Sequence, residues 1–253
     1  MVEEKMRVRL TFLQDCLGTL PTDDDIYTNF IATKRKDPEN PKIANPLTQE
    51  ELSEELANLP KNEEDEDYYR GITVFPRLRI EGSDEKIVGI YGHMLKGFFK
   101  NAAWACNQVP DSLTSKCFAY IKKIDNLVHV NRISPVNLTE EAKEYMKDHA
   151  NTLPLCQRPL RAKTAQGEMI ALSCSEFIPE GSTVEFEITC LNKEVLNLII
   201  ELLDYGKYNG LGCWRNSGKG QFDWIDADLG EKRPIDPKFL PKKGGKKKAA
   251  AEE

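Results

Sequence analysis

Apolar and polar residues alternate along several short segments of this chain. In residues 183–190, Val184, Phe186 and Ile188 alternate with polar side chains, which is the pattern of a strand with one buried face. Residues 6–13 alternate in the same way. Further strands, some joined by polar turns, are predicted at residues 72–80, 86–90, 117–124, 127–130, 160–163, 168–174 and 221–225.

Helical spacing predicts the remaining elements. Residues 195–203 are almost wholly apolar, so we expect a buried helix there. Thr139 is placed to cap a helix that runs through Lys147, and Thr22 is placed to cap another, with Asp25 in the capping-box position. A short helix is predicted over residues 48–58.

One further helix is predicted over residues 91–107 by its two distinct faces. One face gathers the apolar side chains Leu95, Phe98, Phe99, Ala102, Ala103 and Cys106. With this helix, the main elements follow the order strand, helix, two strands, helix, strand. That order predicts an α+β fold class with a ferredoxin-like (RRM-like) βαββαβ core and long insertions.

The domain organisation predicted from these patterns is simple. We expect residues 1–240 to form a single decorated domain in which residues 19–70 are an acidic insertion or arm. Residues 241–253 are Lys-rich and low in complexity, which is typical of a disordered tail.

Charge is distributed unevenly along the chain. The 253 residues contain 35 Lys and Arg and 41 Asp and Glu, for a net charge of −6, which excludes a histone-like basic protein. Residues 1–70 hold 9 of the basic and 17 of the acidic side chains, so the rest of the chain holds 26 and 24. The overall charge therefore says little about a local binding surface.

Other protein classes can be set aside. No run of about 18 apolar residues predicts a membrane helix, and the charged N-terminus is not a signal peptide, so we expect a cytoplasmic protein without a membrane partner. The seven cysteines contain no CxxC pair, and none of the three histidines lies at metal-ligand spacing. We therefore expect reduced thiols and no bound cofactor.

The polar face of the helix over residues 91–107 is the most informative segment. It collects His93, Lys96, Gly97, Lys100, Trp104 and Asn107, with Asn101 beside them. Lysines attract phosphates, an indole stacks on bases, and a glycine lets a nucleic-acid strand come close. The same pattern also fits an ordinary amphipathic helix with a solvated face.

A second candidate is the glycine-rich segment of residues 210–220. Gly210, Gly212, Gly218 and Gly220 surround the polar and basic residues Arg215, Asn216, Ser217 and Lys219. Backbone N–H groups in such loops bind anions, with phosphate the obvious one. The spacing matches neither a Walker A motif nor a dinucleotide fingerprint, and a plain turn between a helix and a strand is the alternative.

No catalytic constellation is visible. Asp23, Asp24 and Asp25 are placed either to bind a divalent metal or, as first-turn residues, to cap a helix. Residues 63–67 read as a solvated acidic loop. Cys213 lies near Arg215, but no Cys/His pair accompanies it, so it reads as an inert thiol.

Taken in order, several of these segments resemble the RAMP superfamily, the ferredoxin-like RNA-binding proteins of CRISPR effector complexes, and most of all their repeated backbone subunits. Residues 92–100 stand where that family has a "P-G-S-S-L-K-G-x-x-R" motif, with His93 and Met94 in place of the two serines and Lys100 in place of the arginine. Residues 210–220 match its glycine-rich loop. The resemblance covers residues 1–18 and 71–226, including Cys16-Leu-Gly18, the turn at 164–167 and the strand entry at 175–183.

The resemblance implies a single-stranded, guide-like RNA as ligand, with copies of the chain and other effector-complex subunits as partners in an oligomeric ribonucleoprotein of antiviral defence. The implied RNA-binding residues are His93, Lys96, Gly97, Lys100, Asn101, Gly210, Gly212, Arg215, Asn216, Ser217, Gly218, Lys219 and Gly220. Two alternatives stay open at this point. One is a metal-dependent endoribonuclease of the same fold that uses Mg²⁺ and an aspartate among residues 23–25. The other is a phage or structural assembly protein that binds no nucleic acid.

Overall fold

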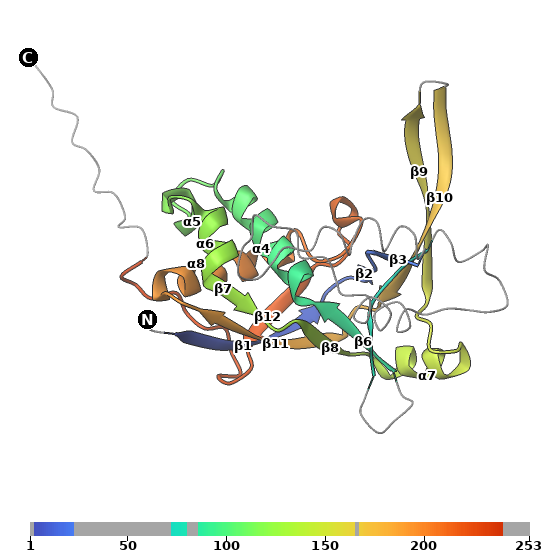
Figure 1. Ribbon diagram of the computed structural model, residues 1–253, viewed down its shortest axis with the longest axis horizontal. Coiled ribbons are helices and arrows are strands. Elements are labelled where there is room, and N and C mark those ends of the chain that lie inside the picture. The colour runs from blue at the N-terminus through green and yellow to red at the C-terminus, as the bar shows by residue number, and fades with distance from the viewer. Residues whose placement is uncertain (1–2, 23–71, 80–85, 165–166, 240–253) are drawn as a thin grey trace, which may run out of the picture.

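The structure is a computed structural model that describes residues 3–22, 72–79, 86–164 and 167–239. Its main body is a seven-stranded sheet in the order β12-β1-β11-β8-β6-β5, with β7 also paired to β11 (Figure 1). The strands are β1 (Glu4–Phe12), β5 (Arg77–Arg79), β6 (Lys86–Tyr91), β7 (Val128–Val130), β8 (Ile133–Asn137), β11 (Thr183–Cys190) and β12 (Phe222–Asp226).

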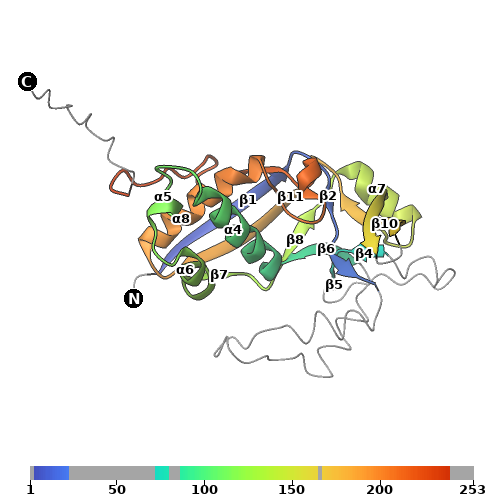
Figure 2. The ribbon, with the colours of Figure 1, turned by 90° about the horizontal axis from the view of Figure 1, so that it is seen from above.

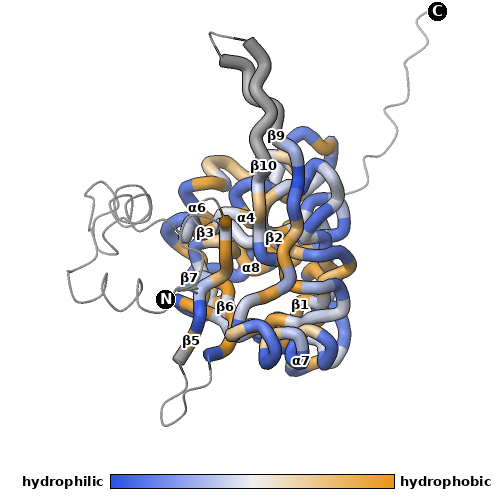
Figure 3. Tube along the Cα trace, turned by 90° about the vertical axis from the view of Figure 1, so that its right-hand side faces the viewer, coloured by the Kyte–Doolittle hydropathy of each residue, from blue (hydrophilic) through white to orange (hydrophobic). Residues whose placement is uncertain are grey.

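The predicted alternation produces the centre of this sheet. Along β1, Met6, Val8 and Leu10 are buried, while the residues between them are exposed or half-buried. β11 repeats the pattern and pairs with β1 antiparallel, with Val8 opposite Phe186. β6 is one of the more hydrophobic strands, as Figure 3 shows, and it extends the sheet beyond β8.

Helices cover one face of the main sheet. α4 (Gly92–Cys106) and α8 (Lys193–Asp204) lie over β1 and β11, with α6 (Tyr120–Leu127) and the single turn α5 (Leu113–Lys116) beside them (Figure 2). α8 is buried over most of its length, as its apolar sequence predicts. The hydrophobic core lies between these helices and the sheet.

The connections confirm the predicted fold class. Strand β1 leads to α4, then to β7 and β8, then to β11, α8 and β12, and the inner strand order is β12-β1-β11-β7/β8. Neighbouring strands in this group run antiparallel. The core is therefore the ferredoxin-like βαββαβ arrangement within an α+β protein.

A second, smaller sheet joins this core and has the order β2-β10-β4-β3, with β9 also paired to β10. Its strands are β2 (Cys16–Leu17), β3 (Leu20–Pro21), β4 (Ile72–Val74), β9 (Leu155–Thr164) and β10 (Gly167–Ile178). β9 and β10 form the hairpin predicted around residues 164–167, but it is much longer than predicted and projects from the body (Figure 1).

A buried ion pair joins β10 of this second sheet to the start of β5 in the main sheet. Arg77 Nη2 lies 2.6 Å from Glu176 Oε1, and both side chains are almost fully buried. The other oxygen of Glu176 accepts the N–H of Phe75, and Arg77 Nη1 donates to the Phe75 carbonyl. Such a fully hydrogen-bonded pair tolerates burial because each charge has partners.

Two predicted strands are wrong and several other elements lie outside the described residues. The strand predicted over residues 72–80 is divided at residues 75–76 into β4 and β5, which belong to different sheets. Residues 120–127 form α6 rather than part of a strand, because Tyr120, Ile124 and Leu127 recur at helical spacing, with Ile124 buried. The predicted helix of residues 139–147 is confirmed as α7 (Glu140–Asp148), capped by Thr139. The segments outside the described residues are 23–25, 36–47, 48–58, 63–67 and the tail after 239.

Candidate nucleic-acid interface

The inner face of α4 holds the helix in place. The six side chains predicted for its apolar face are all buried. The helix begins at Gly92, whose N–H donates to the Arg132 carbonyl and where a Cβ atom would lie only 2.2 Å from the Asn131 oxygen. Only glycine therefore fits where the helix passes the turn between β7 and β8.

The outer face of α4 presents the predicted polar residues to solvent. Trp104 is 64% exposed, although it is a large aromatic residue. Gly97 is exposed as well, and no atom lies within 4 Å of the position that a Cβ would take. His93 stacks on Tyr91, with ring centroids 5.2 Å apart. This face therefore has open space, a base-sized apolar surface and positive charge together.

Both lysines of this face are held by one residue of α6. Lys100 Nζ lies 3.0 Å from Asp125 Oδ1, and Lys96 Nζ donates to the backbone oxygen of Asp125 at 3.2 Å. Burial lowers the pKa of Lys96 below its ordinary value, Asp125 acts in the opposite direction, and Lys100 lowers it further. The exposed pair stabilises the protein by only about 0–1 kcal/mol. A phosphate can therefore displace Asp125 at small cost.

A hydrogen bond joins α4 to the start of the glycine-rich loop. Asn209 Nδ2 donates to Asn101 Oδ1 at 3.2 Å. Tyr208, the residue before Asn209, is 75% exposed, and its carbonyl accepts a hydrogen bond from Gln221 Nε2. The two regions that the sequence predicts to act together are therefore in contact at this point. Sequence reasoning missed Tyr208, although an exposed aromatic directly before a glycine-rich loop was the available signal.

The glycines of the loop serve the packing of its backbone. A Cβ on Gly210 would lie 1.6 Å from the Gly220 oxygen, and one on Gly220 would lie 1.8 Å from the Leu211 oxygen. The N–H of Leu211 donates to Gly220, and that of Gly220 donates to the Asp15 carbonyl. Several loop N–H groups are thus spent on closing the loop. These N–H groups cannot also donate to an anion, so the loop offers a phosphate fewer backbone donors than its glycines predict.

The polar residues of the loop fall into two groups. Arg215, Asn216 and Ser217 form the 3₁₀ turn η4 (Arg215–Ser217), which ends at Gly218 with a φ of +80°. Lys219 Nζ is instead paired with Asp15 Oδ2 at 2.6 Å and is largely covered. Lys219 therefore joins the loop to the segment between β1 and β2, whereas Asn216 and Ser217 are exposed.

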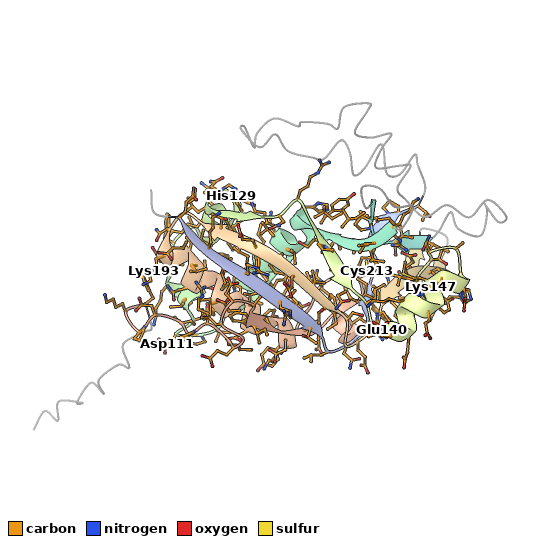
Figure 4. The ribbon with its side chains drawn as sticks, turned by 90° about the horizontal axis from the view of Figure 1, so that it is seen from below. Asp111, His129, Glu140, Lys147, Lys193 and Cys213 are labelled. Atoms are coloured by element: carbon orange, nitrogen blue, oxygen red, sulfur yellow. The ribbon has the colours of Figure 1, made fainter. Side chains whose placement is uncertain are left out.

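The far side of the loop lies against the second sheet. Cys213 is bridged to Leu17 of β2, its N–H donating to the Leu17 carbonyl at 3.2 Å, and Figure 4 labels its side chain. The next residue, Trp214, stands under the guanidinium of Arg158 from β9, whose carbon lies 5.3 Å from the ring centroid. Sequence reasoning missed this contact, since no local pattern connects residues so far apart.

The face of the main sheet that carries no helices is a poor nucleic-acid surface. In the view of Figure 4, β1 and β11 lie open on this side. Their outward residues form exposed ion pairs, Arg9 and Arg7 with Glu185 and Lys5 with Glu187. These pairs cancel charge across the strands and put no aromatic ring there, in contrast to sheets that stack RNA bases.

The described part of the chain contains neither a group of side chains placed to bind a metal ion nor a membrane-spanning helix. No group of three or more His, Cys, Asp or Glu side chains is placed there to hold a metal ion. No helix of that part is long and apolar enough to cross a bilayer. The predicted metal candidates, residues 23–25, lie outside the described residues.

No protein-family model matches the sequence, and no curated protein matches it. Two similar solved structures come from CRISPR complexes. A chain of the type III-B Cmr-beta complex bound to cognate target RNA is 11% identical with a TM-score of 0.41, over 88% of this chain and 58% of that one. A chain of a type IV-B CRISPR complex is 11% identical with a TM-score of 0.42, over 88% and 90%. The protein thus spans less than two thirds of the type III-B chain.

Proposed function

We propose that this protein binds single-stranded RNA, mainly through the sugar-phosphate backbone, as a repeated subunit of a CRISPR-type effector ribonucleoprotein. The observation that carries the proposal is the contact between Asn101 and Asn209, which joins the basic face of α4 to the glycine-rich loop. The resemblance of both segments to RAMP motifs supports the setting. In this proposal, copies of the chain lie side by side on one strand.

The chemistry of the α4 face fits a phosphate backbone. Lys96 and Lys100 lie one turn apart and both contact Asp125, Lys96 through its backbone oxygen and Lys100 through its carboxylate, so incoming phosphates compete with a single surface residue. Gly97 leaves room for close approach between the two lysines. Trp104 and Tyr208, both highly exposed, supply rings on which bases stack without regard to sequence.

Backbone contacts of this kind predict weak sequence preference and strong salt dependence. Each lysine that neutralises a phosphate of single-stranded nucleic acid adds about 0.7 to the slope of log affinity against log salt. Replacing Lys96 and Lys100 with alanine should therefore lower that slope by about 1.4. The affinity itself should fall most at low salt.

Fluorescence anisotropy with a labelled single-stranded RNA tests this proposal. The Lys96→Ala/Lys100→Ala variant is compared with wild type over a salt series. Lys143→Ala is the matched control, because Lys143 forms a similar exposed pair with Glu140 but lies on α7. The control should bind as wild type does. A double variant with wild-type affinity and slope would contradict the proposed site.

The two alternatives give different results in the same preparation. A ribonuclease would shorten the RNA in Mg²⁺ and lose this activity when Asp23, Asp24 and Asp25 are replaced. An assembly protein would form oligomers without RNA, show no RNase-sensitive absorbance at 260 nm after purification at low salt, and bind no RNA.

A further inference from the structure

Four charged side chains are buried in the described part of the protein, and one of them differs from the rest. Arg77 is paired with Glu176, and Asp226 with Arg233 at 2.7 Å. Arg158 has no carboxylate partner among the described residues. Its side chain is 9% exposed, and its Nε and Nη1 atoms are buried without a hydrogen-bond acceptor.

This arrangement is unfavourable for the free protein. A guanidinium does not lose its proton in proteins, so Arg158 keeps its charge in the buried position. The ring of Trp214 gives it a cation–π contact, which is weak compared with the loss of hydration and of two hydrogen bonds. The site therefore has an unused capacity for an anion with paired oxygen acceptors.

The residue that covers Arg158 is itself held in an unfavourable conformation. Trp214 has a φ of +57°, in the left-handed region that a bulky side chain rarely adopts, and it is 43% exposed. The bond from the Cys213 N–H to the Leu17 carbonyl fixes the backbone just before it. Displacing this indole uncovers the guanidinium and leaves that bond in place.

We propose that Arg158 binds one phosphate group of the RNA and that Trp214 is the cover which the phosphate displaces. The inference rests on the proposed function and extends its RNA path from Asn209 along the loop to β9. Nε and Nη1 are the atoms without an acceptor, and Nε and Nη2 form the edge of a guanidinium that takes two oxygens of one phosphate in parallel hydrogen bonds. Arg215, next to Trp214, adds a second positive charge on the same loop.

Two variants separate binding from folding. Arg158→Met keeps an unbranched apolar stem and removes the unpaired charge, so its urea midpoint should equal or exceed that of wild type. Its RNA affinity should fall about tenfold, the usual scale for one charge-assisted contact. Arg158→Lys should recover only part of that loss, because lysine lacks the paired donors. Lys143→Ala serves again as the control for loss of one positive charge.

A second measurement detects the displacement of the Trp214 indole directly. With Trp104→Phe, the remaining indoles are Trp214 and Trp224, and Trp224 is buried. Titration with inorganic phosphate at constant ionic strength, with chloride as the reference salt, should shift the emission to longer wavelength as Trp214 moves into solvent. Adding Arg158→Met should abolish the shift.

The outcomes distinguish this inference from the proposed function. If wild type binds RNA, and Arg158→Met binds equally well with no phosphate-dependent shift in the Trp104→Phe protein, the inference is overturned and the function stands. If wild type binds no RNA, the function fails. An Arg158-dependent shift with free phosphate but no RNA binding would then overturn the assignment to RNA phosphate.

Discussion

The α4 face and the glycine-rich loop are both predicted to hold phosphates, but they are built in opposite ways. On α4, the polar side chains project from a helix whose other face is buried in the core. They can therefore be substituted without disturbing the fold. In the loop, Gly210 and Gly220 pack backbone against backbone. A basic residue near glycines therefore indicates a phosphate-binding loop only where close backbone packing does not itself require the glycines.

The largest effect should come from filling the loop. Gly220→Ala places a Cβ about 1.8 Å from the Leu211 oxygen at a φ of +75°. Overpacking and backbone strain together should lower the free energy of unfolding by about 3 kcal/mol or more. Urea denaturation measures this loss.

Gly230→Ala is the matched control. Gly230 has the same φ of +75°, but nothing lies within 4 Å of the added atom. It should lose only the strain, about 1 kcal/mol. Equal losses in the two variants would mean that the close packing of the loop is not what requires glycine.

A smaller effect, an increase in RNA affinity, should follow from freeing Lys100. Asp125→Asn removes the carboxylate that holds Lys100 at 3.0 Å. Because the pair is exposed and worth up to about 1 kcal/mol, RNA affinity should rise about two- to fivefold. Glu140→Gln, which frees Lys143 on α7, should leave the affinity unchanged. Weaker binding by Asp125→Asn would show that Asp125 helps to form the site.

The next smaller effect should come from adding a side chain at Gly97 of α4. Gly97→Ala adds a methyl group in open space on a helix, which should stabilise the fold by about 0.5–1 kcal/mol. If RNA approaches the helix here, its affinity should fall in the same variant. Thermal unfolding and anisotropy, measured on one preparation, separate these two responses. Unchanged affinity would place the strand away from Gly97.

Much of this architecture could be read from local patterns, and the rest depends on distant contacts. The six apolar positions of α4 follow from 3.6-residue periodicity, and β11 from its alternation, because burial of one face leaves a periodic trace. The contact of Arg158 with Trp214 and the pairing of Lys219 with Asp15 leave no such trace. The predicted strand over residues 117–124 fails because the helical spacing shows only when Leu127, which the pattern assigns to the next strand, is taken together with Tyr120 and Ile124.

The smallest effect concerns the protonation of Lys96. Burial lowers its pKa in the folded protein, so at alkaline pH the unfolded chain holds a proton that the native state has released. The contribution of Lys96 to the free energy of unfolding therefore rises as the pH approaches the ordinary pKa of lysine. Between about pH 8 and pH 10, the free energy of unfolding of wild type should increase relative to Lys96→Met. Lys123, whose hydrogen bond to Glu194 raises its pKa, acts with the opposite sign but is common to both proteins. A difference that stays flat over this range would mean that Lys96 keeps its proton as an ordinary lysine does, and that the α4 face carries its full charge before RNA arrives.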